Sequence, residues 1–283
     1  MLERLNFCIS SNVLLFNMRQ NAAVIRPVSL YSRLLEGLRV KPKANVQNQP
    51  NSNVWIVTDT NWSSYLQPEE MREMGAICPP KPYRKGEVIF RQGDPAESLF
   101  IVLQGNVKLS MTGSTGRDRV VAICGPDDFF GESFLCGAKN QHAQAVSLAE
   151  KTMVCPISLQ QFLEVSQRIP SIALLFAMVL VARVKSLETQ LELMASPTQA
   201  RLGRCLLLLA KRFGSEVTPG IVQLNIGLKH EDLASLAATT RVSATQALST
   251  WRALGFIDGT RGEYLIRIQA FEGLIEQLEQ ERL

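Results

Sequence analysis

The stretch Leu228–Ile257, LKHEDLASLAATTRVSATQALSTWRALGFI, predicts two short helices joined by a tight turn. Glu231 and Asp232 suit the first turn of the first helix, where the helix dipole favours negative charge. Thr240 suits the N-cap of the second helix. The inward positions of both helices are small or apolar, so the two helices can cross closely. These positions are Leu233, Ala234, Leu236, Ala237, Ala244, Ala247, Leu248 and Trp251.

The outward face of the second helix is mostly polar, and Arg241 lies at its N-terminal end. A recognition helix meets base edges in the major groove at this end. The same face carries Val242, Thr245, Gln246 and Ser249. The pattern favours a DNA-reading helix-turn-helix, and the alternative is a surface hairpin in a larger α-helical domain.

A β-hairpin is predicted directly after these helices, with strands over 255–259 and 263–268 and a glycine-bearing turn between them. A hairpin in this place is a wing, so the stretch favours a winged helix-turn-helix over a plain helical hairpin. Arg261 lies at the hairpin tip, where it can meet phosphate. His230, at the entry of the first helix, is a second candidate phosphate contact.

The chain has 283 residues, 46% of them hydrophobic and 20% charged, which predicts a globular protein of about two domains. Its net charge of +4 permits an anionic partner. The apolar segment 172–184 is too short to cross a membrane and contains Arg183. We therefore expect a soluble, cytoplasmic protein without a membrane partner.

The sequence shows no P-loop, nucleophile elbow or metal-spaced group of histidines and cysteines, so we do not expect an enzyme. The six cysteines form no C-x-x-C pair, which argues against a zinc ribbon or a thioredoxin-like redox motif. We interpret most of them as ordinary core residues of a protein in a reducing compartment. They are Cys8, Cys78, Cys124, Cys136, Cys155 and Cys205.

Residues 1–61 are basic, poor in acids and contain the polar stretch NVQNQPNSN. We interpret them as a disordered basic arm. Two alternatives stay open: a start codon placed too early, with Met18 or Met71 as the true initiator, or an organellar transit peptide.

Short strands punctuated by glycines follow, which predicts an antiparallel barrel or sandwich. A short helix is expected before them, over 69–76, and another after them, over 159–165. The predicted strands lie within 83–95 and over 99–103, 107–111, 120–124, 143–148 and 152–157.

A long helix is predicted from Pro170 to about Ala195. Apolar residues recur along it at alternating spacings of four and three, the pattern of a coiled-coil seam. These residues are Leu180, Val184, Leu187, Leu191 and Met194. The alternative is a single helix lying on its own barrel. Ser196 and Pro197 interrupt the helix and predict a hinge. A helix from Thr198 and a strand over 222–226 then lead into the helix-turn-helix.

This order resembles the cyclic-AMP receptor protein and fumarate-nitrate regulator (Crp/Fnr) superfamily of bacterial transcription factors. The resemblance covers about 83–268, and its marks are KGEVIFRQGDPAESLFIVLQGNVKL, the loop FFGES and the helix-turn-helix. It implies an α+β fold with a cyclic-nucleotide-binding-like jelly-roll barrel, a dimerisation helix and a C-terminal winged helix-turn-helix. It also implies a homodimer that binds a pseudo-palindromic double-stranded DNA operator, with RNA polymerase as a further partner. The expected domains are 1–61 (arm), 62–168 (barrel with flanking helices), 169–195 (dimerisation helix) and 196–283 (DNA-binding domain).

The resemblance carries over only in part to the recognition helix. Arg241 matches a family arginine that contacts guanine, and its fork suits the O6 and N7 acceptors. Val242 stands where the family often has glutamate, and Gln246 stands where a second arginine often lies. We therefore expect a DNA preference that differs from the familiar half-site.

The resemblance also implies an effector pocket. Glu132, between Gly131 and Ser133, matches the glutamate that holds a ribose hydroxyl in cyclic-nucleotide binders. The arginine and serine that neutralise the cyclic phosphate are absent near His142 and Ala143, and an unpaired buried phosphate is costly. Ser186, on the long helix, falls near a hydroxyl that reaches the base.

Cyclic AMP therefore stays one candidate effector beside another small molecule or none. The chain has only two histidines and lacks an N-terminal cysteine cluster, so we expect neither haem nor an iron-sulfur cluster. Because Glu132 is retained, an alternative function also stays open: a cyclic-nucleotide sensor whose output is a protein partner.

Overall fold

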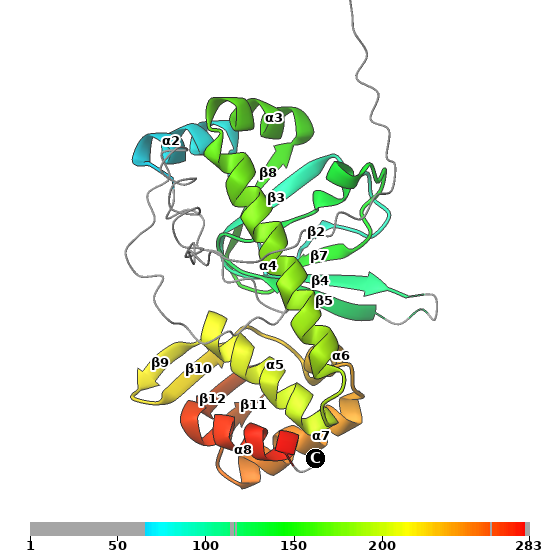
Figure 1. Ribbon diagram of the computed structural model, residues 1–283, viewed down its shortest axis with the longest axis vertical. Helices are drawn as coiled ribbons and strands as arrows, with labels where there is room; N and C mark the ends of the chain where they lie inside the picture. The colour runs from blue at the N-terminus through cyan, green and yellow to red at the C-terminus, as the bar shows by residue number, and fades with distance from the viewer. Residues whose placement is uncertain (1–65, 114–115, 117, 261, 281–283) are drawn as a thin grey trace, which may run out of the picture.

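The computed structural model describes residues 66–113, 116, 118–260 and 262–280, and the basic stretch 1–61 lies outside them. Figure 1 shows a β-rich N-terminal part and a mixed C-terminal part, joined by the long helix α4 (Ser171–Leu193). The predicted order of elements along the chain is confirmed.

The N-terminal part consists of two four-stranded antiparallel sheets, ordered β1-β8-β3-β6 and β2-β7-β4-β5. Their inner faces share one core, in which Phe90 and Val107 of one sheet meet Val102 and Phe130 of the other. The described strands therefore form a two-sheet jelly roll and not a closed barrel. The strands are β1 (Lys81–Tyr83), β2 (Val88–Phe90), β3 (Ser98–Gln104), β4 (Val107–Thr112), β5 (Asp118–Cys124), β6 (Phe129–Phe130), β7 (Gln144–Ser147) and β8 (Thr152–Ser158).

The FFGES segment, expected as a turn and loop, contains the two-residue strand β6 and the start of the 3₁₀ helix η2 (Glu132–Cys136). Phe130 pairs with Phe100 of β3 and is fully buried. Gly131 follows with φ 78°, and a Cβ there would lie 2.7 Å from the Phe100 ring. Glycine is therefore required at the point where the chain turns toward Glu132.

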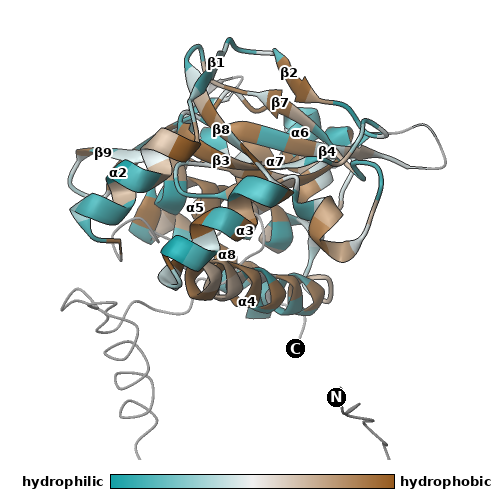
Figure 2. Cartoon of the chain, turned by 90° about the horizontal axis from the view of Figure 1, so that it is seen from above, coloured by the Kyte–Doolittle hydropathy of each residue, from teal (hydrophilic) through white to brown (hydrophobic). Residues whose placement is uncertain are grey.

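Helices flank the jelly roll, with α2 (Pro68–Ile77) before it and α3 (Leu159–Arg168) after it. Helix α4 buries Ile172, Leu175 and Val179 of its first half in the core beneath. The exposed apolar residues of the predicted seam run from Leu180 to the C-cap Met194. Figure 2 shows α4 as a largely hydrophobic helix at the edge of the molecule.

No single helix in the described part of the chain is long and apolar enough to cross a membrane. Helices α3 and α4 reach that length and composition only as a pair, and they are bent by 117° from one another.

The C-terminal part places its helices around the four-stranded sheet β11-β12-β10-β9. The strand β9 and the last helix, α8, were not anticipated. Helix α8 buries Phe271 and Ile275, and Ile275 packs so closely on Gly203 of α5 that a Cβ there would overlap it. The elements are α5 (Thr198–Phe213), β9 (Ser215–Thr218), β10 (Ile221–Asn225), α6 (His230–Leu236), α7 (Arg241–Ala253), β11 (Ile257–Thr260), β12 (Glu263–Arg267) and α8 (Ile268–Gln280).

Candidate nucleic-acid interface and effector cavity

The recognition helix α7 begins as expected, with Thr240 at its N-cap. The Thr240 hydroxyl accepts a hydrogen bond from the backbone N–H of Ser243 at 3.1 Å, which satisfies one of the free donors of the first turn. The inward positions Ala244, Ala247, Leu248 and Trp251 are all buried. The predicted inward face is therefore confirmed.

The outward face of α7 is open to solvent. Arg241 lies at the first helical residue, and Val242 is 66% exposed although it is apolar. The exposed residues of this face are Arg241, Val242, Thr245, Gln246 and Ser249. The structure thus brings together every predicted base-reading residue of α7 on one surface. Arg261, predicted at the wing tip, lies outside the described residues.

The turn between α6 and α7 is held by Arg201, a residue of α5 that the sequence did not single out. Its guanidinium donates to the carbonyls of Ala237 at 3.1 Å and Ala238 at 3.3 Å. It also donates to the carbonyl of Ser196 at 2.7 Å. Arg201 therefore connects the predicted hinge to the helix-turn-helix, and its long-range partners left no local signal in the sequence.

His230 lies at the start of α6 and faces α7. Its Nδ1 is 3.0 Å from the hydroxyl of Thr245, and its Nε2 is enclosed without a partner among the described atoms. Burial lowers the pKa of His230, and the positive charges of Arg252 and Arg241 lower it further. The neutral imidazole is therefore favoured, and a phosphate contact by His230 stays a prediction.

This pKa shift predicts a pH dependence of stability. Because the pKa is lower in the folded state, the unfolded chain takes up the proton first as the pH falls. The contribution of neutral His230 to the free energy of unfolding should be fully present above the ordinary histidine pKa of about 6.5. It should decrease as the pH falls below that value. Urea midpoints measured across this range should change less for His230→Gln than for the parent. His142→Gln is the matched control, and an equal flattening there would contradict the assignment.

Helix α6 packs against the outer side of the β4–β5 hairpin. Lys108 of β4 forms an ion pair with Asp232 at 2.8 Å, and Asp232 also accepts the backbone N–H of Lys229 at 2.9 Å. The backbone N–H of Val120 donates to the hydroxyl of Ser235 at 2.7 Å. The jelly roll and the helix-turn-helix are therefore bonded directly.

A second contact joins α5 to the same sheet region. The guanidinium of Arg212 lies 3.6 Å from the buried carboxylate of Asp128 and donates to the carbonyl of Pro126 at 3.0 Å. The Phe213 ring lies where a Cβ on Gly125 would be. The two parts of the chain thus meet over two adjoining patches.

A cavity of about 100 Å³ lies inside the jelly roll against α4. Glu132 and Arg183 line it, and the two side chains form an ion pair. Arg183 also donates to the carbonyl of Phe129. The apolar wall comes from strands β4 and β5 and includes Leu109, Met111, Val121 and Ile123.

The predicted pocket residues are partly brought together. Glu132, His142 and Ala143 line the cavity. Ser133 is buried beside it, with its hydroxyl 2.5 Å from Nδ1 of His142, and Gly131 supplies the preceding turn. Ser186 lies in α4, but its side chain is outside the described residues.

The sequence did not identify Arg183 as a pocket residue. In the sequence, Arg183 was noticed only as a positive charge inside the apolar segment 172–184. It was used there as an argument against a membrane span. Among the described residues, no group of three or more histidines, cysteines or carboxylates could hold a metal ion.

The fold and its exposed recognition helix define a DNA-binding transcription regulator. The model of the cyclic nucleotide-binding domain matches residues 80–168, and that of the Crp-like helix-turn-helix domain matches residues 200–277. A global nitrogen regulator from Synechocystis sp. is 30% identical over 198 residues, covering 67% of this chain and 86% of the relative. The chain therefore belongs to the Crp/Fnr family of transcription regulators.

Other relatives agree with this assignment. The cyclic AMP receptor protein of Thermus thermophilus is 29% identical over 184 residues, covering 65% of this chain and 81% of its own. The c-di-GMP responsive global regulator CLP of Xanthomonas campestris shares the fold, with a TM-score of 0.61 and 20% identity over 71% of this chain and 99% of its own. These relatives are regulators rather than enzymes by name, and the matched helix-turn-helix favours a DNA output over docking to a protein.

Proposed function

We propose that this chain binds a pseudo-palindromic double-stranded DNA operator as a homodimer, with one α7 in each of two successive major grooves. Half-site centres would then lie about one helical turn, roughly 34 Å, apart. The observation that carries this proposal is the exposed face of α7, which presents Arg241 at the end of the helix that meets base edges. The working division is 62–168 for sensing, 169–195 for dimerisation and 196–283 for DNA binding.

Dimerisation is assigned to the stretch that runs from Leu180 in α4 to the C-cap of this helix, Met194. Its apolar residues are exposed by between 38% and 73% in the single chain, far more than an internal helix would allow. They are Leu180, Val184, Leu187, Leu191 and Met194. A second copy of α4 would cover them in a coiled-coil seam.

RNA polymerase is the further partner that we propose. A Mycobacterium tuberculosis relative, 26% identical over 195 residues, bears the name of a cAMP-activated global transcriptional regulator. An activator of this kind acts on transcription, so a contact with polymerase is the simplest output of the DNA-bound dimer.

The effector site that we propose is the cavity beside Glu132. Its volume of about 100 Å³ is small against the roughly 300–1,000 Å³ of typical ligand pockets. A nucleotide would therefore have to displace Arg183 and release Glu132 from its ion pair. Arg183 would then be available as the cation for an anionic effector, in place of the arginine that is absent near His142. Cyclic AMP is one candidate for such an effector.

Selection of bound sequences from random DNA, with and without cyclic AMP, tests the proposal. We expect a two-fold symmetric consensus. If no sequence is enriched, a sequence-specific regulator is the wrong conclusion. A consensus that forms equally well with and without cyclic AMP would point to another effector or to none.

Arg241→Ala should lower affinity for the selected operator by about 1–3 kcal/mol and relax the preference at one base pair of each half-site. The reason is the loss of a bidentate contact with guanine. Fluorescence anisotropy and a repeated selection measure the two effects. Arg91→Ala, which removes an exposed arginine of the jelly roll, is the matched control. An unchanged sequence profile for Arg241→Ala would show that the recognition helix is wrongly assigned.

A further inference from the structure

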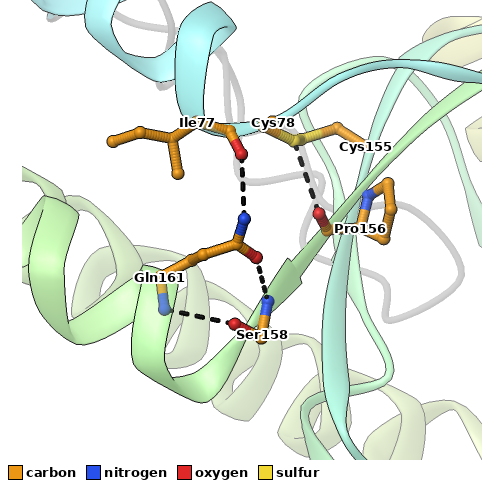
Figure 3. The surroundings of a disulfide bond; sticks show 6 residues. All are labelled: Ile77, Cys78, Cys155, Pro156, Ser158 and Gln161. Atoms are coloured by element: carbon orange, nitrogen blue, oxygen red, sulfur yellow. Dashed lines mark hydrogen bonds between the residues drawn. A yellow bond between two sulfur atoms is a disulfide. The ribbon is translucent and has the colours of Figure 1, made fainter.

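Two cysteines that are far apart in the sequence are joined at the base of the jelly roll. Cys78 is the C-cap of α2 and Cys155 lies in β8, and a disulfide links them across a sequence separation of 77 (Figure 3). Their Cα atoms are 5.5 Å apart, the usual separation for a disulfide. The sequence did not predict this disulfide, because most of the six cysteines were interpreted as ordinary core residues.

The segment that the bond holds has few other attachments. Strand β1 has three residues, lies at the edge of its sheet and contains Pro82, which has no N–H to donate to β8. Helix α2 buries only Met74 of its own ten residues. Few buried contacts give a segment low local stability, so a covalent link here has a large local effect.

Side-chain hydrogen bonds join α2 to helices α3 and α4. The side-chain amide of Gln161 donates to the carbonyl of Ile77 at 3.1 Å, as Figure 3 shows, and Gln161 is itself fixed by the N-cap Ser158. The hydroxyl of Ser171, in the first turn of α4, donates to Glu70 at 3.4 Å. Helix α2 therefore contacts the start of the proposed dimerisation helix.

In the reduced state, Cys78 would have a hydrogen-bond acceptor nearby. Sγ of Cys78 lies 3.8 Å from the carbonyl oxygen of Pro156, so a thiol at this position has an acceptor. Both cysteines are almost fully buried, at 3% and 2% exposure.

The other described cysteines form no disulfide. Cys124 and Cys205 are buried, and burial raises the pKa of the Cys124 thiol and raises that of Cys205 to about 12. Neither of them is joined to another described cysteine. Cys136 is exposed and has no disulfide partner in the described part of the chain.

We propose that Cys78 and Cys155 are a reversible redox-modification site, oxidised by a low-molecular-weight disulfide such as oxidised glutathione, whose state determines how firmly α2 and β1 are held. In the first step, local opening of α2 exposes Cys78, and its thiolate attacks the glutathione disulfide, forms a mixed disulfide and releases one glutathione. In the second step, the Cys155 thiolate attacks Sγ of Cys78 and expels the second glutathione. Two protein thiols and one oxidised glutathione thus give one protein disulfide and two reduced glutathiones.

The experiment uses the full chain, equilibrated in buffers of varied glutathione ratio, quenched, alkylated and mapped by mass spectrometry. We expect a linked Cys78–Cys155 peptide in oxidising buffer and two alkylated cysteines in reducing buffer. Cys136→Ser is the matched control and should give the same titration. Absence of the linked peptide at every ratio, or its persistence in strongly reducing buffer, would overturn the proposal.

Amide hydrogen exchange across 66–83 supplies the second measurement. We expect exchange to be about tenfold faster in the reduced form, because the segment opens locally without its covalent link. Cys78→Ser and Cys155→Ser should exchange at the fast rate in both buffers, whereas Cys136→Ser should follow the parent. Equal exchange in the two redox states of the parent would contradict a role in holding α2.

Discussion

Leu187→Asp is expected to convert the dimer into a monomer and to lower operator affinity by about 100-fold. Leu187 lies within the exposed seam of α4 and is 42% exposed in the single chain. In a dimer, the two carboxylates would face one another in a desolvated seam, where an unpaired charge is strongly unfavourable. The monomer could engage only one half-site, so the advantage of simultaneous binding would be lost.

Sedimentation equilibrium gives the mass, and fluorescence anisotropy on the selected operator gives the affinity. Leu163→Asp is the matched control, because Leu163 is a similarly exposed leucine, at 53%, on α3. It should leave the mass and the affinity unchanged. A dimeric mass for Leu187→Asp would show that the interface lies elsewhere on the molecule.

Asp232→Ala is expected to lower the free energy of unfolding by about 3 kcal/mol. Asp232 is 5% exposed. Its carboxylate accepts hydrogen bonds from the ammonium of Lys108 and from the backbone N–H of Lys229. Its removal leaves the partly buried charge of Lys108 without its partner and removes a bond at the start of α6. The effect should therefore exceed that of a surface ion pair.

Urea denaturation measures this difference, and Glu231→Ala is the neighbouring control. Glu231 pairs with Lys229 at 3.3 Å, but both side chains are largely exposed, so we expect a change of about 0.5 kcal/mol or less. The double variant Lys108→Met with Asp232→Ala should recover part of the loss, because no unpaired charge remains. Equal effects of Asp232→Ala and Glu231→Ala would contradict a bonded contact between the jelly roll and α6.

The helix-turn-helix could be predicted in detail because its signals are local. Helical spacing placed Ala244 and Trp251 inward and Arg241 outward, and a threonine in front of the helix marked its start. Most strands of the jelly roll were found for the same reason, since Gly86, Gly93, Gly105 and Gly125 lie in turns between them. The exposure of Leu187 agrees with the predicted seam, but its role in dimerisation stays a prediction.

The missed features all depend on contacts between distant residues. Strand β6 is two residues long, too short for any periodicity, and is defined by its pairing with β3. Ile275 of helix α8 packs against Gly203 of α5, about 70 residues earlier in the chain. Arg183 meets Glu132 at a separation of 51, and Cys78 meets Cys155 at 77. Such partners become visible only when the topology brings them together.

The β4–β5 hairpin has the cavity on one side and helix α6 on the other. Leu109 and Val121 line the cavity, while their neighbours Lys108 and Val120 bond to helix α6. A cavity-facing residue and a helix-facing residue are therefore adjacent in the chain. Any molecule that moves these strands would shift helix α6, which contacts the recognition helix α7, within the same protomer. Each protomer of a dimer would then couple its own cavity to its own recognition helix.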